Sequence, residues 1–333
     1  MSELPAIPLC EALKRFEVAK LSDGLKRKSV ESYRHHVRLF LRSLPPERAM
    51  VGMVTAGDID AFMASERLRL AELRKRRALA KGEPLTERNG EASGYSMLMN
   101  HGVLNLFFSW MEDSDELGNP SSPFRNRRGK KRKPPKVGQH LPRRASYDDV
   151  LKILRLLPTC TWLNQRDRAI VQLMLDTGLR AGEVCALQVN DLDMNKRELI
   201  VRSGKGNKDR WVPFTEKTRR EVTLYLLRRP PCPEGFSSIL FLSAMNAWGG
   251  NVRGPLGVGG LGHLWRSLSK FAGVPKINPH SVRHLYGFKA LNDGVRLEVV
   301  SKLMGHASPG FTLKIYAPLL RETARADYEA NWK

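Results

Sequence analysis

The sequence predicts a mainly α-helical chain with two domains, the first wholly helical and the second combining helices with a small antiparallel sheet. Three observations lead to this prediction. Apolar residues recur at helical spacing along much of the chain, whereas only residues 198–214 have the composition of a strand hairpin. A basic, proline-containing stretch separates the two parts. A length of 333 residues suits one or two domains.

The charge of the chain indicates a polyanionic partner. Lys and Arg number 56 against 34 Asp and Glu, a formal net charge of +22. This excess favours nucleic acid, with an anionic membrane surface as the alternative. No apolar run approaches the roughly 20 residues of a spanning helix, and the first residues lack a signal-peptide core. The four cysteines form no CxxC pair, which is typical of reduced thiols in a cytosolic protein.

Residues 1–124 are predicted to form the first domain. Apolar residues of "SVESYRHHVRLFLRSL" make a helical stripe, with Ser29 as the expected N-cap. Thr55 is expected to cap a second helix, residues 93–111 read as a third, and residues 81–93 as a polar loop. The polar side of the first helix is either a DNA-facing surface or an ordinary solvated face, and it carries Arg34, His35, Arg38 and Arg42.

Residues 125–144, "RNRRGKKRKPPKVGQHLPRR", are predicted to form an interdomain linker. They hold ten Lys or Arg, three Pro and no acid, so they cannot bury a core. Such a linker can lie along a phosphate backbone, and a nuclear-localisation signal is the alternative. The candidate DNA-contacting residues in it are Arg127, Arg128, Lys130, Lys131 and Lys133.

Residues 145–333 are predicted to form the second domain. Helices are expected at "SYDDVLKILRLL", "NQRDRAIVQLMLDTGL", 216–228, 261–272, 279–293 and 296–304, with strands on either side of a Gly-Lys-Gly turn. Gly178 lets the chain turn after a helix, so that Arg180 starts the next one. Lys205 lies at the hairpin tip. Taken singly, Arg180 and Lys205 also fit ordinary solvated side chains.

The stretch "NPHSVRHLYG", residues 278–287, has two interpretations. His280 and His284, four apart, share a helix face and suit half a zinc site. Alternatively Asn278 caps the helix and Pro279 occupies its first position, which puts His280 and Arg283 in the first turn, where the positive helix end attracts phosphate and favours a neutral imidazole. No HExxH motif or cysteine pair completes a zinc site, so the phosphate interpretation is favoured and no metal is expected.

The set "TGLRAGE", "GKGNKDRWVP", "HSVRH" and "LMGHAS…IYAPL" resembles, in that order across residues 147–320, the tyrosine recombinases or phage-type integrases, in particular their Xer-like members. The last of these motifs contributes His306 and, ten residues later, Tyr316. The interval between them is one residue longer than in many Xer-like members. Residues 1–125 resemble the family's helical, SAM-like core-binding domain in pattern only.

The resemblance implies a site-specific recombinase that cleaves and rejoins DNA through a 3′-phosphotyrosyl intermediate, for integration, excision or resolution of DNA elements. It implies Tyr316 as nucleophile, Arg180 and Arg283 on the phosphate, His280 as proton acceptor, Lys205 as acid and His306 as hydrogen-bond donor. His284 then supports the site. No cofactor is expected.

The resemblance also implies assembly and context. The two domains would form a C-shaped clamp on double-stranded DNA with an inverted-repeat core site. A homotetramer is expected, alone or with a related recombinase, coupled through an apolar tail within residues 318–333. The expected location is cytoplasmic and nucleoid-associated, without a membrane partner, and the charge and the 81–93 loop favour a mobile element.

Rival functions stay open at this point. A type IB topoisomerase shares the tyrosine chemistry, and a DNA-binding protein without catalysis shares the charge. "GVGGLG", residues 257–262, matches the dinucleotide-binding pattern, yet no predicted strand directly precedes it and no acid follows at about 20 residues. A glycine-rich loop is predicted there instead.

Overall fold

In the computed structural model the chain divides into two compact units, Met1–Gln139 and His140–Lys333. The structure describes residues 7–80, 82, 84, 94–125, 129–135, 144–202, 209–232, 235, 238–244, 252–306 and 308–316. Each unit buries an apolar core of its own, so each packs independently. The predicted fold class, mainly helical with small antiparallel sheets, is confirmed.

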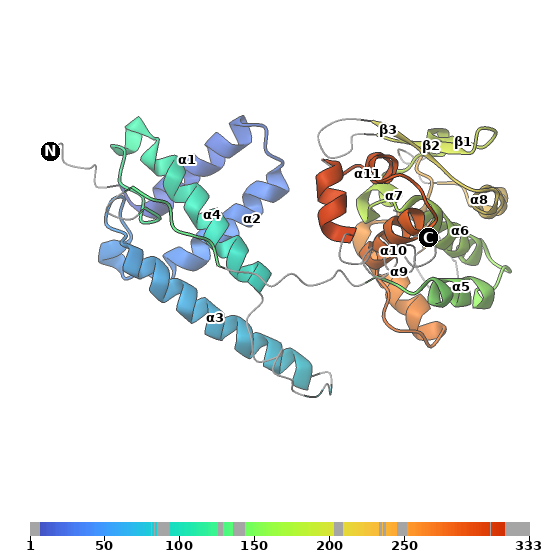
Figure 1. Ribbon diagram of the computed structural model, residues 1–333, viewed down its shortest axis with the longest axis horizontal. Coiled ribbons are helices and arrows are strands. Elements are labelled where there is room, and N and C mark those ends of the chain that lie inside the picture. Colours follow the sequence, from blue (N-terminus) through green and yellow to red (C-terminus); the bar gives the residue numbers. More distant parts are fainter. Residues whose placement is uncertain are drawn as a thin grey trace, which may run out of the picture. The chain divides into compact units, whose positions relative to one another are not determined.

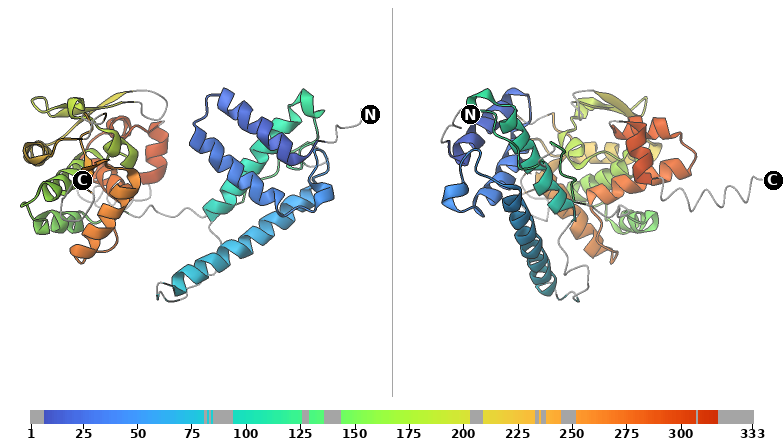
Figure 2. Two further views of the ribbon diagram at one scale, coloured as in Figure 1. Left: turned by 180° about the vertical axis from the view of Figure 1, so that it is seen from behind. Right: turned by 60° about the vertical axis from the view of Figure 1, so that its left-hand side comes forward.

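Among the described residues of the first unit, the regular elements are all helices (Figure 1). Its elements are α1 (Leu9–Ser22), α2 (Arg27–Leu41), η1 (Pro46–Arg48), α3 (Ala56–Leu79), α4 (Gly94–Glu112) and η3 (Asp115–Leu117). Aromatic rings form the core, with Phe16 edge-on to Phe107 at 5.3 Å and Phe40 edge-on to Phe62 at 5.3 Å. Helix α3, 24 residues long, runs past the ends of the other helices (Figure 2).

The two predicted helix starts in this unit differ in outcome. Thr55 caps α3 as expected, because its hydroxyl accepts a hydrogen bond from the backbone N–H of Asp58. The prediction for α2 was wrong by three residues. Lys26 is the N-cap, and Ser29 lies in the first turn, where its N–H donates to the carbonyl of Lys26 at 2.8 Å.

The described parts of the expected linker attach to the units at its two ends. Arg125 and Lys131 form an antiparallel bridge, and the backbone N–H of Arg132 donates to the carbonyl of Phe124 at 2.8 Å. The guanidinium of Arg132 also binds the Asp60 carboxylate of α3. At the other end, Arg144 stacks over Phe288, 3.8 Å from the ring centroid. The described residues at both ends of the 125–144 stretch therefore pack against the units.

The second unit combines helices with two small sheets (Figure 1). Its elements are α5 (Tyr147–Leu156), α6 (Trp162–Thr177), α7 (Ala181–Ala186), η4 (Val189–Asp191), β1 (Leu192–Asp193), β2 (Glu198–Val201), β3 (Arg210–Pro213), α8 (Glu216–Arg228), β4 (Leu242–Ala244), β5 (Val252–Pro255), α9 (Val258–Phe271), α10 (Pro279–Asn292) and α11 (Leu297–Met304). The predicted hairpin is β2–β3, and β1 extends it to three antiparallel strands.

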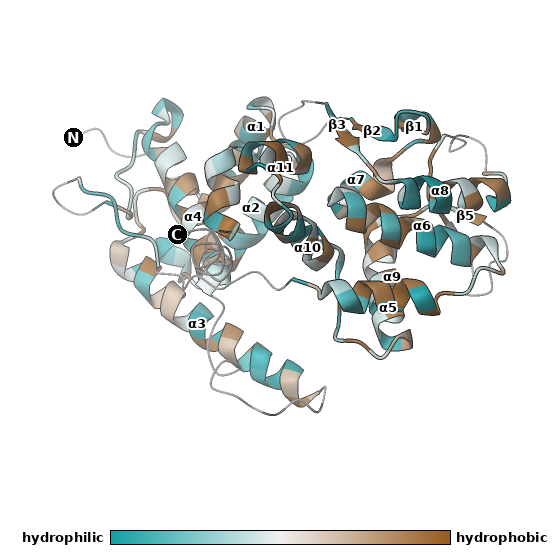
Figure 3. Cartoon of the chain, turned by 45° about the vertical axis from the view of Figure 1, so that its right-hand side comes forward, coloured by the Kyte–Doolittle hydropathy of each residue, from teal (hydrophilic) through white to brown (hydrophobic). Residues whose placement is uncertain are grey.

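Helix α6 forms the centre of this unit and packs against α5, α8 and α10. Most of its residues from Gln165 to Thr177 are buried, polar as well as apolar ones. Thr161 caps its start, and Gly178 ends it in the left-handed region at φ 59°. Figure 3 shows that hydrophilic and hydrophobic residues alternate along α3.

The prediction of a loop at "GVGGLG" was wrong. Strand β5 ends at Pro255, and Val258 begins α9, so the glycines lie in the first turns of a helix that directly follows a strand. Burial of Leu261 and Trp265 stabilises this helix despite its glycines. The strand belongs to a two-stranded antiparallel sheet, unlike the parallel sheet that a dinucleotide-binding fingerprint requires.

In the part of the chain that the structure describes, no helix has the length and apolarity to cross a bilayer. Two further predictions, the loop at 81–93 and the apolar tail at 318–333, lie almost wholly or wholly outside the described residues.

Candidate active site

Arg180 is positioned by a turn that requires glycine. A side chain on Gly178 would place its Cβ 2.3 Å from the ring of Tyr286, in addition to the strain of a positive φ. The chain then enters α7 with Arg180 as its N-cap, as predicted. The Arg180 guanidinium donates to Glu183 Oε1 at 2.8 Å and to the carbonyl of Gly305 at 2.6 Å.

Arg283 reaches the same place from α10. Asn278 caps this helix and Pro279 occupies its first turn, which confirms the expected geometry of the start. The buried guanidinium of Arg283 donates to the carbonyl of Gly178 at 2.7 Å and to that of Met304 at 2.5 Å. Burial and the neighbouring positive charge of Arg180 lower its pKa to about 10, so it remains protonated at neutral pH.

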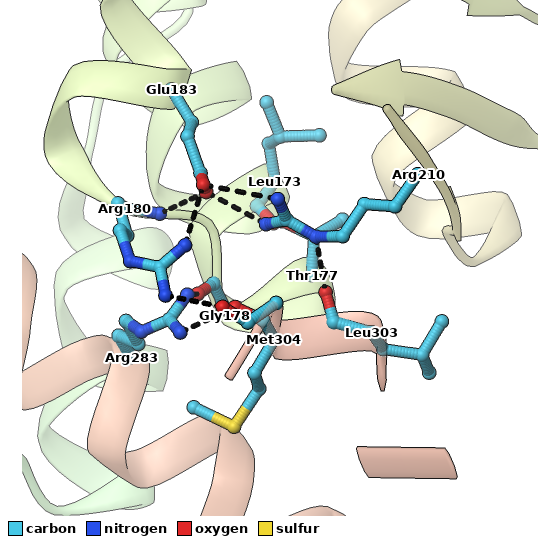
Figure 4. A network of polar contacts seen from close by, with 10 residues as sticks. Leu173, Thr177, Gly178, Arg180, Glu183, Arg210, Arg283, Leu303 and Met304 are labelled. Carbon is cyan, nitrogen blue, oxygen red and sulfur yellow. Dashed lines mark hydrogen bonds and ion pairs between the residues drawn. The ribbon is translucent and has the colours of Figure 1, made fainter. Parts of the chain in front are cut away.

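A buried ion pair between Glu183 and Arg210, which no local pattern in the sequence indicates, joins these elements (Figure 4). Arg210 of β3 donates to both Glu183 carboxylate oxygens, at 3.0 and 2.8 Å, and through Nε to the carbonyl of Leu303 at 2.8 Å. Glu183 also accepts hydrogen bonds from Arg180. The pair therefore ties the hairpin to α7 and to the end of α11.

Two histidines lie on the α10 face beside the arginines. The rings of His280 and His284 meet edge to face, 4.3 Å between centroids. Partial desolvation, followed by the charges of Arg283 and Arg180, lowers the pKa of His280. Burial, followed by the neighbouring His280, lowers the pKa of His284 to about 4. Both rings are therefore neutral at pH 7 in this state, which suits proton acceptance.

His306 follows Gly305 at the end of α11. Its Nδ1 lies 2.6 Å from the hydroxyl oxygen of Thr312, and its ring packs edge-on against Phe311. Burial, followed by the charges of Arg283 and Arg180, lowers the pKa of His306 to about 4. Gly305 is itself confined, because a Cβ there would lie 2.9 Å from the guanidinium of Arg210.

Tyr316, in the helical residues 309–316, is fully buried. Its hydroxyl lies 3.4 Å from His284 Nδ1 and 3.9 Å from the sulfur of Met304. It occupies a space that exists only because residue 287 is glycine, since a Cβ there would be 2.3 Å from the hydroxyl oxygen. Burial raises the pKa of Tyr316 to about 12, and the charge of Arg283 opposes that rise.

Five of the six predicted catalytic residues thus come together from α7, α10 and the segment after α11: Arg180, His280, Arg283, His306 and Tyr316. The sixth, Lys205, lies outside the described residues, between the described ends of β2 and β3. Across the described ranges, no three His, Cys, Asp or Glu side chains gather as metal ligands.

The candidate DNA-contacting residues of the first unit lie along α2, in linker residues outside the described ranges, and in described linker residues with exposed side chains. Arg34 and Arg38 line one shallow depression along α2 with His35 and Arg42, but Arg34 is held by both carboxylate oxygens of Glu17. In the expected linker, Arg127 and Arg128 lie outside the described residues, and the exposed side chains are Lys130, Lys131 and Lys133.

The comparisons with known proteins agree with this geometry. The phage integrase family matches residues 144–322. The chain belongs to the phage integrase family. It is 28% identical to the tyrosine recombinase XerA of Thermococcus kodakarensis, over 96% of this chain and 94% of that protein. It is 34% identical to XerD of Corynebacterium glutamicum over 58% of this chain, a match that spans only 62% of XerD.

Solved structures show the same fold. The Tn1549 transposon integrase, in complex with a circular intermediate DNA, has a TM-score of 0.67 at 17% identity, covering 98% of this chain and 100% of that one. A lambda integrase dimer bound to a COC′ core site has a TM-score of 0.61 at 17% identity, covering 93% and 77%. The predicted membership of the tyrosine recombinase or phage-type integrase family is confirmed, and the topoisomerase alternative has less support.

Proposed function

We propose that this recombinase cleaves double-stranded DNA with Tyr316 as its nucleophile. The phenolic oxygen attacks the scissile phosphorus, a 3′-phosphotyrosyl bond forms, and the bond to the 5′-oxygen breaks, so that a 5′-hydroxyl leaves. The bond energy stays in the phosphotyrosyl ester. Attack by the 5′-hydroxyl of a second strand then releases Tyr316 and completes strand exchange without ATP.

One observation supports the proposal above all. The guanidiniums of Arg180 and Arg283 are held side by side by hydrogen bonds that they donate to backbone carbonyls of neighbouring segments. Guanidiniums stay charged and bind phosphate oxygens in pairs, so they suit the extra negative charge of a pentacoordinate phosphorane. Both are held by the protein before DNA arrives. Little reorganisation is then needed when that charge develops.

The remaining roles concern protons. A phenol with a raised pKa must lose its proton as it attacks, and His280, neutral beside two guanidiniums, is the proposed acceptor. Lys205 is the proposed acid for the leaving 5′-oxygen. His306 is proposed to donate a hydrogen bond to a nonbridging oxygen. Because the Tyr316 hydroxyl lies against His284 in this state, cleavage requires a movement that brings it to the phosphate.

Tyr316→Phe tests the nucleophile. Nicked genomic fragments are incubated with the full chain, covalent adducts are trapped in detergent, and the attached ends are sequenced to obtain the site. On a nicked substrate with that site, Tyr316→Phe should bind normally and form no adduct. Tyr286→Phe is the matched control, because Tyr286 is a second tyrosine near Arg283. An adduct that persists in Tyr316→Phe and vanishes in Tyr286→Phe would transfer the role to Tyr286.

For the assembly we propose a homotetramer, alone or with a related recombinase, clamped on an inverted-repeat core site. The net charge of +22 supports a long contact with DNA. We further propose that the protein serves a mobile element and acts on nucleoid DNA in the cytoplasm. Mass measurement of the complex on its selected site tests the stoichiometry. Relaxation of plasmids by a monomer without a specific site would favour a topoisomerase instead.

A further inference from the structure

The segment from His306 to Tyr316 contains a buried threonine that the catalytic scheme leaves without a role. Thr312 is fully buried, and its hydroxyl oxygen lies 2.6 Å from His306 Nδ1. Its neighbours Phe311 and Leu313 are 51% and 47% exposed, so the burial is specific to one helix face. Tyr316, four residues later, is buried on the same face. Thr312 thus contacts the predicted hydrogen-bond donor from the helix that carries the predicted nucleophile.

The contact has chemical consequences because His306 is neutral. Burial and the nearby guanidiniums hold its pKa at about 4, so at pH 7 one ring nitrogen carries a proton and the other does not. A threonine hydroxyl can donate to Nδ1 or accept from it. If it donates, the proton of His306 is on Nε2. If it accepts, Nε2 has a bare lone pair, which would repel a phosphate oxygen.

We propose that Thr312 is a positioning residue, whose hydroxyl donates to Nδ1 of His306 and so holds the imidazole in the tautomer with Nε2–H available for the scissile phosphate. The partner of one ring nitrogen decides which tautomer the other presents. The hydrogen bond also closes residues 306–312 into a short ring, so His306 keeps its orientation relative to the helix of Tyr316. This inference rests on the proposed function for the role of His306, but the tautomer itself does not depend on catalysis.

Nuclear magnetic resonance on the full chain, labelled with ¹⁵N-histidine, reads the tautomer directly. Two-bond proton–nitrogen correlations distinguish a protonated Nε2 from a protonated Nδ1, and loss of one signal set in His306→Gln assigns the residue. The wild-type protein at pH 7 should show Nε2 protonated. A wild-type signal with the proton on Nδ1 would overturn the inference, whatever the variants do.

Two substitutions separate the hydroxyl from the shape of the side chain. Thr312→Val keeps the volume and removes the donor, so the His306 signals should move to a mixture of tautomers. Adduct formation should slow on the order of ten-fold, the effect of losing about one hydrogen bond in the transition state. Thr312→Ser keeps the hydroxyl and should retain both the tautomer and a rate within about two-fold of wild type.

The matched control is Thr218→Val, at another fully buried threonine, whose hydroxyl donates to Asp176 Oδ2 at 2.6 Å. It should leave the His306 tautomer unchanged. An unchanged tautomer in a folded Thr312→Val would refute the positioning role. A changed tautomer with an unchanged rate of adduct formation would support the role of Thr312 and instead contradict phosphate donation by His306.

Discussion

Arg210→Met should destabilise the second unit by about 3–5 kcal/mol, because it removes one partner of a buried ion pair. The side chains of Arg210 and Glu183 are 9% and 10% exposed, and the arginine makes three hydrogen bonds of 3.0 Å or less. Methionine keeps much of the length without the charge. The variant therefore leaves the Leu303 carbonyl without this donor and Glu183 with fewer compensating charges.

Scanning calorimetry of the full chain measures the effect. For a unit of this size, a loss of 1 kcal/mol in the free energy of unfolding lowers the melting temperature by about 2–4 °C. The midpoint of the second unit should therefore fall by about 6–20 °C in Arg210→Met. Arg219→Met is the matched control. Arg219 pairs with Glu216 on the surface, where the side chains are 46% and 57% exposed, and the change should leave the midpoint nearly unchanged because solvent screens this pair. If the midpoint of thermal unfolding falls no further in Arg210→Met than in this control, the reasoning is refuted.

The same pair predicts a pH dependence. Burial opposes the charged form of Glu183, but hydrogen bonds from Arg210 and Arg180 outweigh it and hold the carboxyl pKa below its usual value of 4.5. A depressed pKa stabilises the fold above the unfolded-state value, and this stabilisation is lost as pH falls through the folded-state value. The difference in the free energy of unfolding between wild type and Arg210→Met should therefore be constant from pH 7 to about 5.5. Below about pH 4.5 this difference should become smaller. A difference that persists to pH 3 would contradict this account.

Three further predictions concern single residues. Thr55→Ala should lower the free energy of unfolding of the first unit by about 1 kcal/mol, measured by urea denaturation. Ser146→Ala, at an N-cap without a side-chain hydrogen bond, should change it little, and equal losses in the two variants would argue against the Thr55 cap. Arg38→Ala should reduce the slope of log affinity for DNA against log salt by about one, and Arg34→Ala by less, because a glutamate already holds Arg34. The rate of adduct formation should be flat from pH 8 to about 6.5 and fall only below it, since the pKa of His280 is lowered and the base must be neutral; a fall that begins above pH 7 would exclude His280 as the acceptor.

The parts of this protein that the sequence predicted are those governed by local rules. Asn278 and Pro279 predict the start of α10, and Thr55 predicts the start of α3. In each case the side chain of the cap residue accepts a hydrogen bond from a backbone N–H of the first turn that follows it. The N-cap of α2 was predicted wrongly at Ser29, because serine also occurs inside the first turn of a helix. No local feature of the sequence favoured Lys26, whose side chain makes no capping hydrogen bond. The glycines of α9 misled because tertiary burial outweighed their low helix propensity.

The ion pair of Glu183 with Arg210 was missed for another reason. The two residues are 27 positions apart, and each alone has the composition of a helix start or a strand. Nothing in either stretch indicates that the other is near. The order of the family's motifs brought Arg180, Arg283 and Tyr316 to one site, but motif order contains no information about which carboxylate holds which arginine.

That arrangement has an electrostatic consequence for catalysis. The Glu183 carboxylate accepts hydrogen bonds from Arg180 and Arg210, and the other side-chain hydrogen bonds that the structure describes for these two residues and for the neighbouring Arg283 go to backbone carbonyls. Carbonyl dipoles fix a guanidinium without cancelling its charge, so an excess of two positive charges remains in a partly desolvated site. A phosphodiester carries one negative charge, and its phosphorane gains a second. On the proposed mechanism, the site is therefore better matched to the transition state than to the substrate. Burial, followed by the charges of Arg283 and Arg180, lowers the pKa of His280 and of His306, so both imidazoles are neutral at pH 7 for their proposed work.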